Sequence, residues 1–265
     1  MLNKEKIFNI FKELGLKNTD NILIHSSLKN IGKIEGNAEA LLDIICQYFN
    51  EGLVILPCHT WSFMNNDLDV LNLDEENSCV GMLPNIALRK GFLRSFHPTH
   101  SIVCYGKNAD KYILNDNETS TPANPNGCFG KLKDINAKIL FLGAKLSKNT
   151  FIHSIEEEFN VPDRLTNHIF KFYVKKNEVF KEYHVHKHYS TLNPHISENY
   201  MKLEKPMIEL NIAKKFQFGD AESIIVDAKK SYDYVSKLLS VNLHIFDYPD
   251  EINEEYYKEK AWFVK

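Results

Sequence analysis

The sequence predicts an α/β fold, a sandwich in which helices cover a central sheet. Short apolar runs alternate along the chain with segments whose apolar residues recur at helical spacing, which is the pattern of such folds. The clearest run is residues 138–143, which indicates a buried strand that ends at Gly143. The composition agrees, because 43% hydrophobic and 25% charged residues in a chain of 265 are ordinary for a globular protein with a sizeable core.

The first half of the chain supplies most of the expected sheet. Gly15 follows the first expected helix, at the position where glycine commonly ends a helix. The polar segment 58–79 and the glycine-, proline- and asparagine-rich segment 121–130 are expected to be loops, and loops of such length are usually functional or mobile. In chain order we expect a helix at 4–14, a strand at 21–25, a helix at 38–49, a strand at 53–56, a helix at 81–90 and a strand at 102–106.

The second half begins with the strand at 138–143, which opens into a helix. Polar residues follow Gly143, and Asn149 or Thr150 can cap the helix that comes next. Two alternating segments, 169–174 and 178–189, predict a hairpin around 175–177. Helices are expected at 221–228 and 232–239. No internal repeat or linker interrupts this order, so we expect a single domain over residues 1–265.

Simple counts exclude several classes of protein. No apolar run approaches the roughly 18–20 residues that span a bilayer, and the first residues are expected to form an amphipathic helix rather than a signal peptide. The formal net charge of -3 gives no reason to expect a nucleic-acid partner. An odd number of cysteines without C-x-x-C spacing argues against a disulfide framework or a cysteine zinc site and fits the reducing cytoplasm. The cysteines are Cys46, Cys58, Cys79, Cys104 and Cys128.

His153 is the first candidate for chemistry. On the expected helix it lies three residues before Glu156 and four before Glu157, so either carboxylate can meet its imidazole. A carboxylate beside a histidine raises its basicity and fixes its tautomer, which suits a general base. The start of a helix after a strand is also where open α/β sheets bind ligands. The alternative is a surface ion pair, which is what most such pairs on helices are.

Four short motifs occur in a fixed order between about residues 5 and 165. They are Ile24-His25-Ser26-Ser27-Leu28 with Gly32 and Gly36, Leu56-Pro57 with Thr60-Trp61, Arg94-Ser95-x-His97-Pro98-x-x-Ser101, and Leu140-x-Leu142-Gly143 followed by Asn149-Thr150-x-x-His153-x-x-Glu156. In order and spacing they resemble the aminoglycoside 3-N-acetyltransferase family, also called the antibiotic N-acetyltransferase family.

The resemblance implies a three-layer α/β/α sandwich with a central mixed sheet, which is not the GNAT fold. It implies transfer of an acetyl group from acetyl-CoA, as co-substrate, to an amine, which in known members is the 3-amino group of a 2-deoxystreptamine antibiotic. The phosphate loop of the GNAT fold, Q/R-x-x-G-x-G/A, is not found in the sequence.

The resemblance also assigns roles to the motif residues. His153 matches the catalytic histidine, Glu156 would orient it, and Thr150 could donate a hydrogen bond near the thioester oxygen. Whether His97 or His153 accepts the proton stays open. The residues expected to bind the cofactor are Ser26, Ser27, Leu28, Lys29, Arg94, Ser95, His97 and Ser101. The alternatives are a plain serine turn, surface charges for Lys29 and Arg94, and a histidine satisfied within the core for His97.

The acceptor side departs from the family pattern. Family members place an acidic residue after the loop tryptophan, Trp61 here, and our candidate is Asp67, with Asp69 as a second choice because Asn65 is not acidic. A later carboxylate is replaced in the segment 183–189, where we place His186. With fewer carboxylates the site would suit a monoamine, such as an amino sugar on a nucleotide or glycan, better than a polycationic antibiotic.

Three further alternatives remain. His184, His186 and His188 alternate and could share one face of a strand as metal ligands, although we expect no metal. Cys58 next to His59 could form an acetyl-enzyme, but neighbouring strand residues point to opposite faces. A relative that binds CoA without catalysis is the third.

Overall fold

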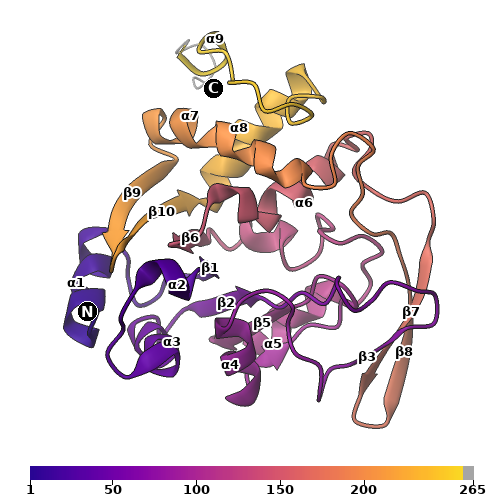
Figure 1. The fold of residues 1–265 in the computed structure, drawn as a ribbon, viewed down its shortest axis with the longest axis horizontal. Helices are drawn as coiled ribbons and strands as arrows, with labels where there is room; N and C mark the ends of the chain where they lie inside the picture. The colour runs from indigo at the N-terminus through magenta and orange to yellow at the C-terminus, as the bar shows by residue number, and fades with distance from the viewer. Residues whose placement is uncertain (259–265) are drawn as a thin grey trace.

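The computed structural model describes residues 1–258, which form a mixed sheet of seven strands between layers of helices, with a smaller sheet beside it (Figure 1). The strand order of the large sheet is β4-β5-β2-β1-β6-β10-β9. These strands are β1 (Ile22–Ser26), β2 (Leu53–Pro57), β4 (Leu93–Arg94), β5 (Ile102–Gly106), β6 (Lys138–Leu142), β9 (Ala213–Phe218) and β10 (Ala221–Asp227). The predicted three-layer α/β/α sandwich with a mixed sheet is therefore confirmed.

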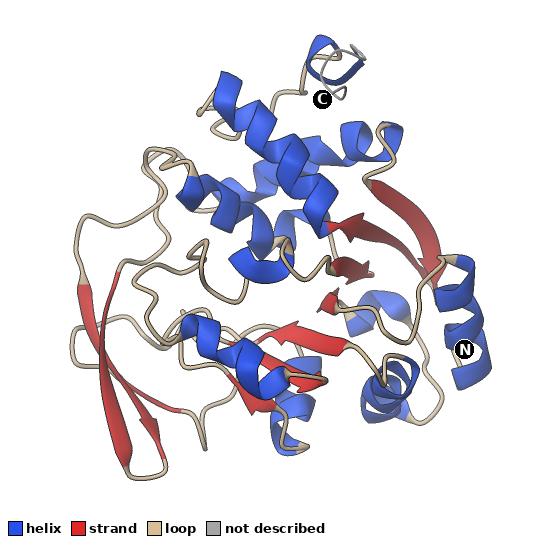
Figure 2. Ribbon diagram, turned by 180° about the vertical axis from the view of Figure 1, so that it is seen from behind, coloured by secondary structure: helices blue, strands red, loops and turns tan. Residues whose placement is uncertain are grey.

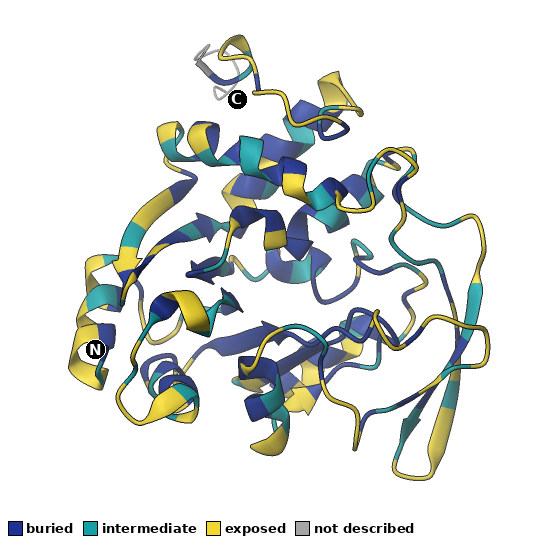
Figure 3. Cartoon of the chain, in the orientation of Figure 1, coloured by how far each residue is buried: buried dark blue, intermediate teal, exposed yellow. Residues whose placement is uncertain are grey.

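The centre of the sheet is parallel and fully covered. β1 pairs in parallel with β2 on one side and β6 on the other, while β5 and β10 run antiparallel to their neighbours. The middle strands are apolar along almost their whole length because both of their faces are buried. Figure 3 shows this contrast between the dark central strands and the exposed tip of the smaller sheet.

Two apolar clusters lie on the two faces of the sheet. Neighbouring residues of β1, Leu23 and Ile24, belong to different clusters because successive side chains of a strand point to opposite faces. One cluster joins the sheet to α1 (Lys4–Glu13), α3 (Asn37–Tyr48) and α4 (Leu83–Arg89). The other joins it to α6 (Thr150–Glu158) and α8 (Ala228–Val241), and the view from behind shows helices in both layers (Figure 2).

Short elements complete the described chain. The helices are α2 (Leu28–Ile31), α5 (Ala109–Tyr112), α7 (Glu204–Glu209) and α9 (Glu255–Lys258), and the 3-10 helices are η1 (Ile113–Asp116), η2 (Gly130–Leu132), η3 (Leu146–Lys148) and η4 (Ile196–Leu203). Over residues 1–258, none of the helices combines the length and the apolar composition needed to cross a membrane.

The smaller sheet contains the predicted hairpin. β7 (Phe170–Lys176) and β8 (Val179–Val185) are antiparallel, and β3 (Val70–Asn72) adds a parallel strand. A third apolar cluster, which includes Phe172 and Val174, fills the inner face of this sheet. The expectation that 58–79 is irregular throughout is thus wrong for three residues, because β3 buries Leu71 in this cluster.

The helix expected at 221–228 is wrong. These residues form β10, which lies between β6 and β9 in the large sheet. The segment contains Ile224, Ile225 and Val226, whose branched side chains favour a strand. The helix begins only at Ala228, where the Asp227 carboxylate accepts a hydrogen bond from the Lys230 N–H at 2.9 Å and caps it.

The topology brings distant segments to one edge of the large sheet. β1, β2 and β6 are parallel, so their carboxyl ends at Ser26, Pro57 and Leu142 lie along the same edge. β5 runs the other way, and its first residue Ile102 pairs with Pro57. The segment before β5 therefore enters this edge, where α6 also begins.

Candidate active site

The imidazole of His153 lies on the first turns of α6 with one ring nitrogen bound and the other free of any hydrogen bond that the structure shows. Its Nδ1 lies 3.2 Å from Glu156 Oε2 and 2.7 Å from the Tyr200 hydroxyl oxygen. The Tyr200 hydroxyl donates its own proton to Glu156 Oε2, so its oxygen accepts from His153. This assigns the proton of a neutral His153 to Nδ1 and leaves the lone pair of Nε2 for a substrate.

Glu156 is held as a buried carboxylate. Its side chain is 0% exposed, and Arg164 donates from Nε to Glu156 Oε1 at 2.7 Å. Arg164 also donates from Nη2 to Asp247 Oδ1 at 2.6 Å, which ties α6 to the C-terminal part of the chain. Burial works to raise the pKa of Glu156, but the hydrogen bond from His153 and the charge of Arg164 outweigh it and hold that pKa below its ordinary value. The carboxylate therefore stays charged beside His153, and the contact that the spacing predicts is present.

Three further histidines form a row of rings that ends on His153. The ring centroid of His188 lies 4.1 Å from that of His153, His100 lies 4.9 Å from His188, and His59 lies 4.5 Å from His100. We call these four residues the imidazole row. Burial, reinforced by repulsion between the rings, lowers the pKa of His59 to about 3 and holds the pKa values of His100 and His188 well below 6.5. These three rings are neutral at neutral pH.

His97 has no free ring nitrogen. Its Nδ1 accepts hydrogen bonds from the backbone N–H groups of Thr99 at 3.1 Å and His100 at 2.9 Å. The proton must then be on Nε2, which donates to the Thr121 carbonyl at 3.0 Å. Burial lowers the pKa of His97 to about 4. Of the two histidines left open by the sequence, only His153 keeps a nitrogen for proton transfer.

The other residues of the 94–101 motif are bonded within the protein. Buried Arg94 donates to the Ser101 hydroxyl and to the carbonyls of Glu76 and Cys58. The Ser95 hydroxyl donates to Asp116, and the Ser101 hydroxyl donates to the Cys58 carbonyl. These bonds hold the segment against the end of β2. A cofactor contact by these side chains stays a prediction. To make it, they would have to break hydrogen bonds that the structure shows intact.

The strand-end segment 26–29 is more accessible. Ser26, Ser27 and Leu28 are half-buried and Lys29 is exposed. The Ser27 side chain makes no capping bond to α2. Next to this segment, Gly143 turns the chain with a φ of 64°, and an added Cβ would lie 3.1 Å from that of Asn30. The chain can thus turn sharply between β6 and η3, and α6 begins with buried Thr150 one turn before His153.

The predicted acceptor residues lie around the loop that follows β2. Trp61 is exposed, whereas Asp67 is bound to His168 Nε2 at 3.0 Å and to the Lys171 backbone N–H at 2.8 Å. His186 Nδ1 donates to the Thr166 carbonyl at 2.6 Å. Neither Asp67 nor His186 is shown in contact with His153. The residue of this hairpin that reaches His153 is His188, two positions beyond His186.

A lysine also enters this loop. Lys187 Nζ donates to the Met64 carbonyl at 2.7 Å and to Asn65 Oδ1 at 2.8 Å. Burial lowers the pKa of Lys187, with Asp69 working in the opposite direction. Asp69 in turn accepts the backbone N–H groups of Asn65 and Asn66, both at 2.8 Å. Both aspartates considered from the sequence therefore already have partners within the protein.

Two of the alternatives lose support from the geometry. His184 pairs with Glu182, His186 with Thr166 and His188 with His153, because β8 ends at Val185 and the alternation stops there. No cluster of three or more metal-ligating side chains occurs within residues 1–258. Burial raises the pKa of the Cys58 thiol, which works against a thiolate nucleophile.

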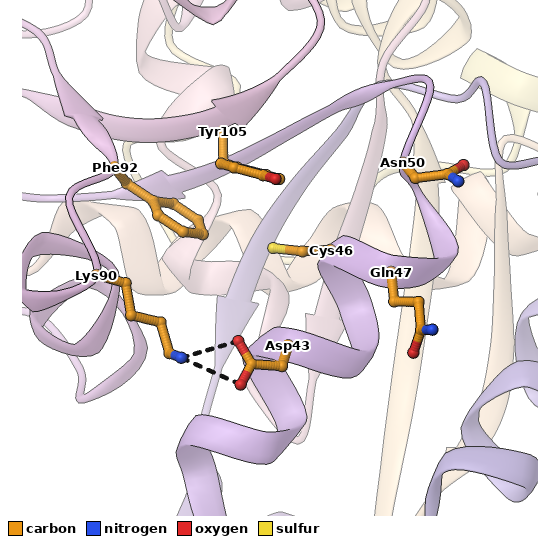
Figure 4. Close-up of a pocket in the computed structure, with 7 residues that line it drawn as sticks. All are labelled: Asp43, Cys46, Gln47, Asn50, Lys90, Phe92 and Tyr105. Carbon is orange, nitrogen blue, oxygen red and sulfur yellow. Dashed lines mark hydrogen bonds and ion pairs between the residues drawn. The ribbon is translucent and has the colours of Figure 1, made fainter.

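A surface hollow of about 500 Å³ lies away from these residues (Figure 4). None of its lining residues belongs to the four motifs, and Lys90 is paired across it with Asp43. The residues are Asp43, Cys46, Gln47, Asn50, Lys90, Phe92 and Tyr105. The hollow carries no feature of acyl-transfer chemistry.

Four residues of the site were not singled out as site residues from the sequence: Arg164, Asp247, Tyr200 and His188. Each meets His153 or Glu156 directly or through one partner, and each comes from a different segment. A tyrosine 44 residues after Glu156, or an arginine beyond the end of its helix, carries no local signal of such a contact. The signal that existed was Glu156 itself, because a carboxylate on the buried side of an amphipathic helix requires a cationic partner.

Comparison with known proteins confirms the resemblance seen in the sequence. The family model described as aminoglycoside 3-N-acetyltransferase matches residues 23–240. The aminoglycoside N(3')-acetyltransferase-like protein YokD of Bacillus subtilis is 27% identical over 206 residues, which cover 68% of this chain and 74% of that protein. Aminoglycoside N(3)-acetyltransferase VII of Streptomyces paromomycinus is 23% identical over 83% of this chain and 85% of its own length.

Solved structures share the fold. The structure of AAC-IIIb with CoASH has a TM-score of 0.77 at 17% identity and covers 91% of this chain and 97% of its own. The crystal structure of YokD has a TM-score of 0.73 at 20% identity and covers 90% of this chain and 93% of its own. The family model spans well over half of the sequence and includes every motif in the site. The chain therefore belongs to the aminoglycoside 3-N-acetyltransferase family.

Proposed function

We propose that the protein is an acetyl-CoA-dependent N-acetyltransferase that moves acetyl directly to an amine of an aminoglycoside or another amino-sugar acceptor. The observation that carries the proposal is His153, whose Nδ1 edge is fixed by Glu156 and Tyr200 and whose Nε2 is left for a substrate. Membership of the family supplies the reaction class. Curated relatives in this family are named as aminoglycoside N(3)-acetyltransferases.

The geometry supports His153 as the general base. The amine nitrogen attacks the thioester carbon, the carbonyl electrons move to oxygen, and His153 Nε2 takes the proton that the nitrogen loses. The C–S bond then breaks, its electrons stay on sulfur, and the imidazolium returns the proton to the thiolate. Glu156 lies 3.2 Å from Nδ1 and stabilises the imidazolium between these steps. Arg164 keeps that carboxylate charged and fixed.

The carrier side of the site is built from the end of β1 and the start of α6. We assign contact with the cofactor to Ser26, Ser27, Leu28 and Lys29, because their side chains are accessible at the sheet edge where α/β folds bind ligands. Thr150 opens α6, whose first N–H groups have no carbonyl within the helix, so it is placed to meet developing negative charge on the thioester oxygen. The structural support next to these residues comes from the hydrogen bonds that Arg94, Ser95, His97 and Ser101 make within the protein.

Acetyl-CoA consumption is the direct test of the reaction. Thiol release is measured with acetyl-CoA against aminoglycosides and nucleotide-linked amino sugars, and an acceptor-dependent rate is expected. His153→Asn should reduce kcat by roughly 10²–10⁴-fold, because general-base catalysis is worth that much. The matched control is His184→Asn, since His184 is an exposed histidine that pairs with Glu182 on the surface. A His153→Asn enzyme with near-normal turnover would end the assignment.

The cellular location and the domain organisation of the protein are also part of the proposal. We propose a cytoplasmic enzyme, supported by five cysteines that are all free within the described structure. We also propose that the chain acts as one domain, because the two large apolar clusters share the strands of a single sheet.

A further inference from the structure

The face of the His153 ring is covered by His188. The two ring planes are inclined by 36° with centroids 4.1 Å apart, which is a close tilted stack. His188 follows β8 and is fixed at its backbone, because it forms a β-bridge with Leu165 and its neighbour Tyr189 donates to the Arg164 carbonyl at 3.1 Å. The segment that holds Glu156 through Arg164 thus also holds the ring that lies on His153.

The contacts on His153 restrain it in different directions. The bonds of Nδ1 to Glu156 and Tyr200 fix one edge of the ring, but a ring can pivot about such an edge and keep both bonds. A stack on the face opposes that pivot. His188 is in turn held by His100, whose ring meets it edge-on at 4.9 Å and 85°. The stack is therefore supported from behind.

We propose that His188 is a positioning residue for acetyl transfer, a neutral ring that fixes the plane of His153 so that Nε2 faces the acceptor amine. The proposal deepens the proposed function and rests on it. Removing the ring leaves His153 able to keep its hydrogen bonds while Nε2 moves away from the line of proton transfer. Misplacement of about 1 Å can cost up to roughly a hundredfold in rate.

The neutral state of His188 is part of the proposal. When His153 takes the proton of the amine, a second positive charge about 4 Å away would oppose it. Half-buried His188 lies beside other ionisable groups, and Glu156 is the anion among those that touch His153. The groups packed around the pair are Glu156 on α6, Arg164 after it, Tyr200 on η4, His97 and His100 before β5, and His59 after β2.

Two substitutions distinguish the effect of the planar ring of His188 from the effect of its ionisable nitrogens. His188→Phe keeps a planar ring and removes both nitrogens, whereas His188→Ala removes the ring. We expect kcat of the phenylalanine variant to stay within about threefold of wild type above neutral pH, and kcat of the alanine variant to fall about tenfold or more with the KM for acetyl-CoA unchanged. The control is His184→Ala, because His184 lies on the same hairpin and pairs with Glu182 on the surface.

The pH profile gives a readout that a merely structural role would not move. A benzene face stabilises a cation more than a neutral imidazole does, so His188→Phe should shift the acid limb of kcat/KM to higher pH by about half a unit. The same shift should appear in an NMR titration of the His153 ring, which needs no turnover. Thermal unfolding of each variant shows whether it is folded.

Each outcome decides the matter. Folded His188→Ala enzyme with normal kcat, or an acid limb and His153 titration that do not move in His188→Phe, overturns the proposal. If the wild-type protein releases no CoA with any acceptor, the proposed function fails, and the NMR titration still tells whether His188 controls His153. A loss of rate in His188→Ala that phenylalanine restores, together with the shifted limb, supports it.

Discussion

Mild acid should destabilise this protein more than a typical one, because it buries histidines as neutral rings. Burial lowers the pKa of His25 and His59 from 6.5 to about 3 and that of His97 to about 4. In the unfolded chain these groups take up protons below about pH 6.5, whereas in the folded chain they do not. The stability that these neutral histidines contribute is therefore fully present above their unfolded-state pKa of about 6.5, and it is lost as the pH falls below that pKa.

The size of this loss follows from the shifts. Between about pH 7.5 and about pH 5.5 each of the three histidines costs about 1.4 kcal/mol, or about 4 kcal/mol together. Glu157 opposes them, because burial raises its pKa from 4.5 to about 7 and its stabilising effect is lost as the pH rises. Over the same interval Glu157 returns about 2 kcal/mol, which leaves a net loss of about 2 kcal/mol. His100 and His188 are shifted in the same direction as the other histidines and add to the loss.

Guanidinium unfolding at these two pH values measures the loss. His25→Phe provides a reference, because the His25 ring stacks on Phe141 at 4.8 Å, and its Nε2 is among the buried side-chain atoms without a hydrogen-bond partner in the described structure. The variant keeps a buried ring and should lose about 1.4 kcal/mol less than wild type on acidification. Equal stability of the wild type at both pH values, or an identical loss in both proteins, would refute the reasoning.

Three other substitutions test the bonds around the site. Arg164→Leu leaves the buried carboxylates of Glu156 and Asp247 without their cation and should lower the free energy of unfolding, measured with denaturant, by about 3–5 kcal/mol. An unchanged unfolding midpoint would contradict the ion-pair geometry. Tyr200→Phe removes a hydroxyl bonded to a charged group and should cost about 1.5–3 kcal/mol, with a fall in thiol release that is smaller than for His153→Asn. Arg94→Leu should lower stability by about 3 kcal/mol with the KM for acetyl-CoA unchanged, and a raised KM would instead support a phosphate contact.

Local signals predict the framework of the site well. The apolar runs give β1, β2 and β6, and the spacing of His153 and Glu156 gives the contact seen between Nδ1 and Oε2. These features depend on residues close in sequence, for which strand and helix periods suffice. The strand 221–227 was mistaken for a helix because a short apolar run has the same appearance in both, and only its pairing with β6 and β9 decides.

Long-range contacts explain what the sequence does not predict. Tyr200 on η4 lies 44 residues from Glu156 in the sequence and meets it only in the fold, while Arg164, 8 residues after Glu156, reaches it from beyond the end of α6. His188 rather than His186 is the residue of this hairpin that meets His153, since β8 ends at Val185 and the alternation of a strand no longer orders the residues that follow. The polar motif 94–101 has a similar limit, because its donors could serve a ligand or the protein, and only the bonding partners tell which.

The chain after α6 matters to the candidate site as much as the motif at the start of that helix, although the resemblance loosens beyond about residue 165. Glu156 is fully buried, and a carboxylate there stays charged only if a cation reaches it, which Arg164 does. Arg164 carries a second carboxylate, Asp247, which lies in the last part of the described chain and balances its charge. Tyr200 and His188 then fix two sides of the His153 ring. The motif at the start of α6 supplies the proposed base, and the later segments supply the groups that bind it and keep Glu156 charged.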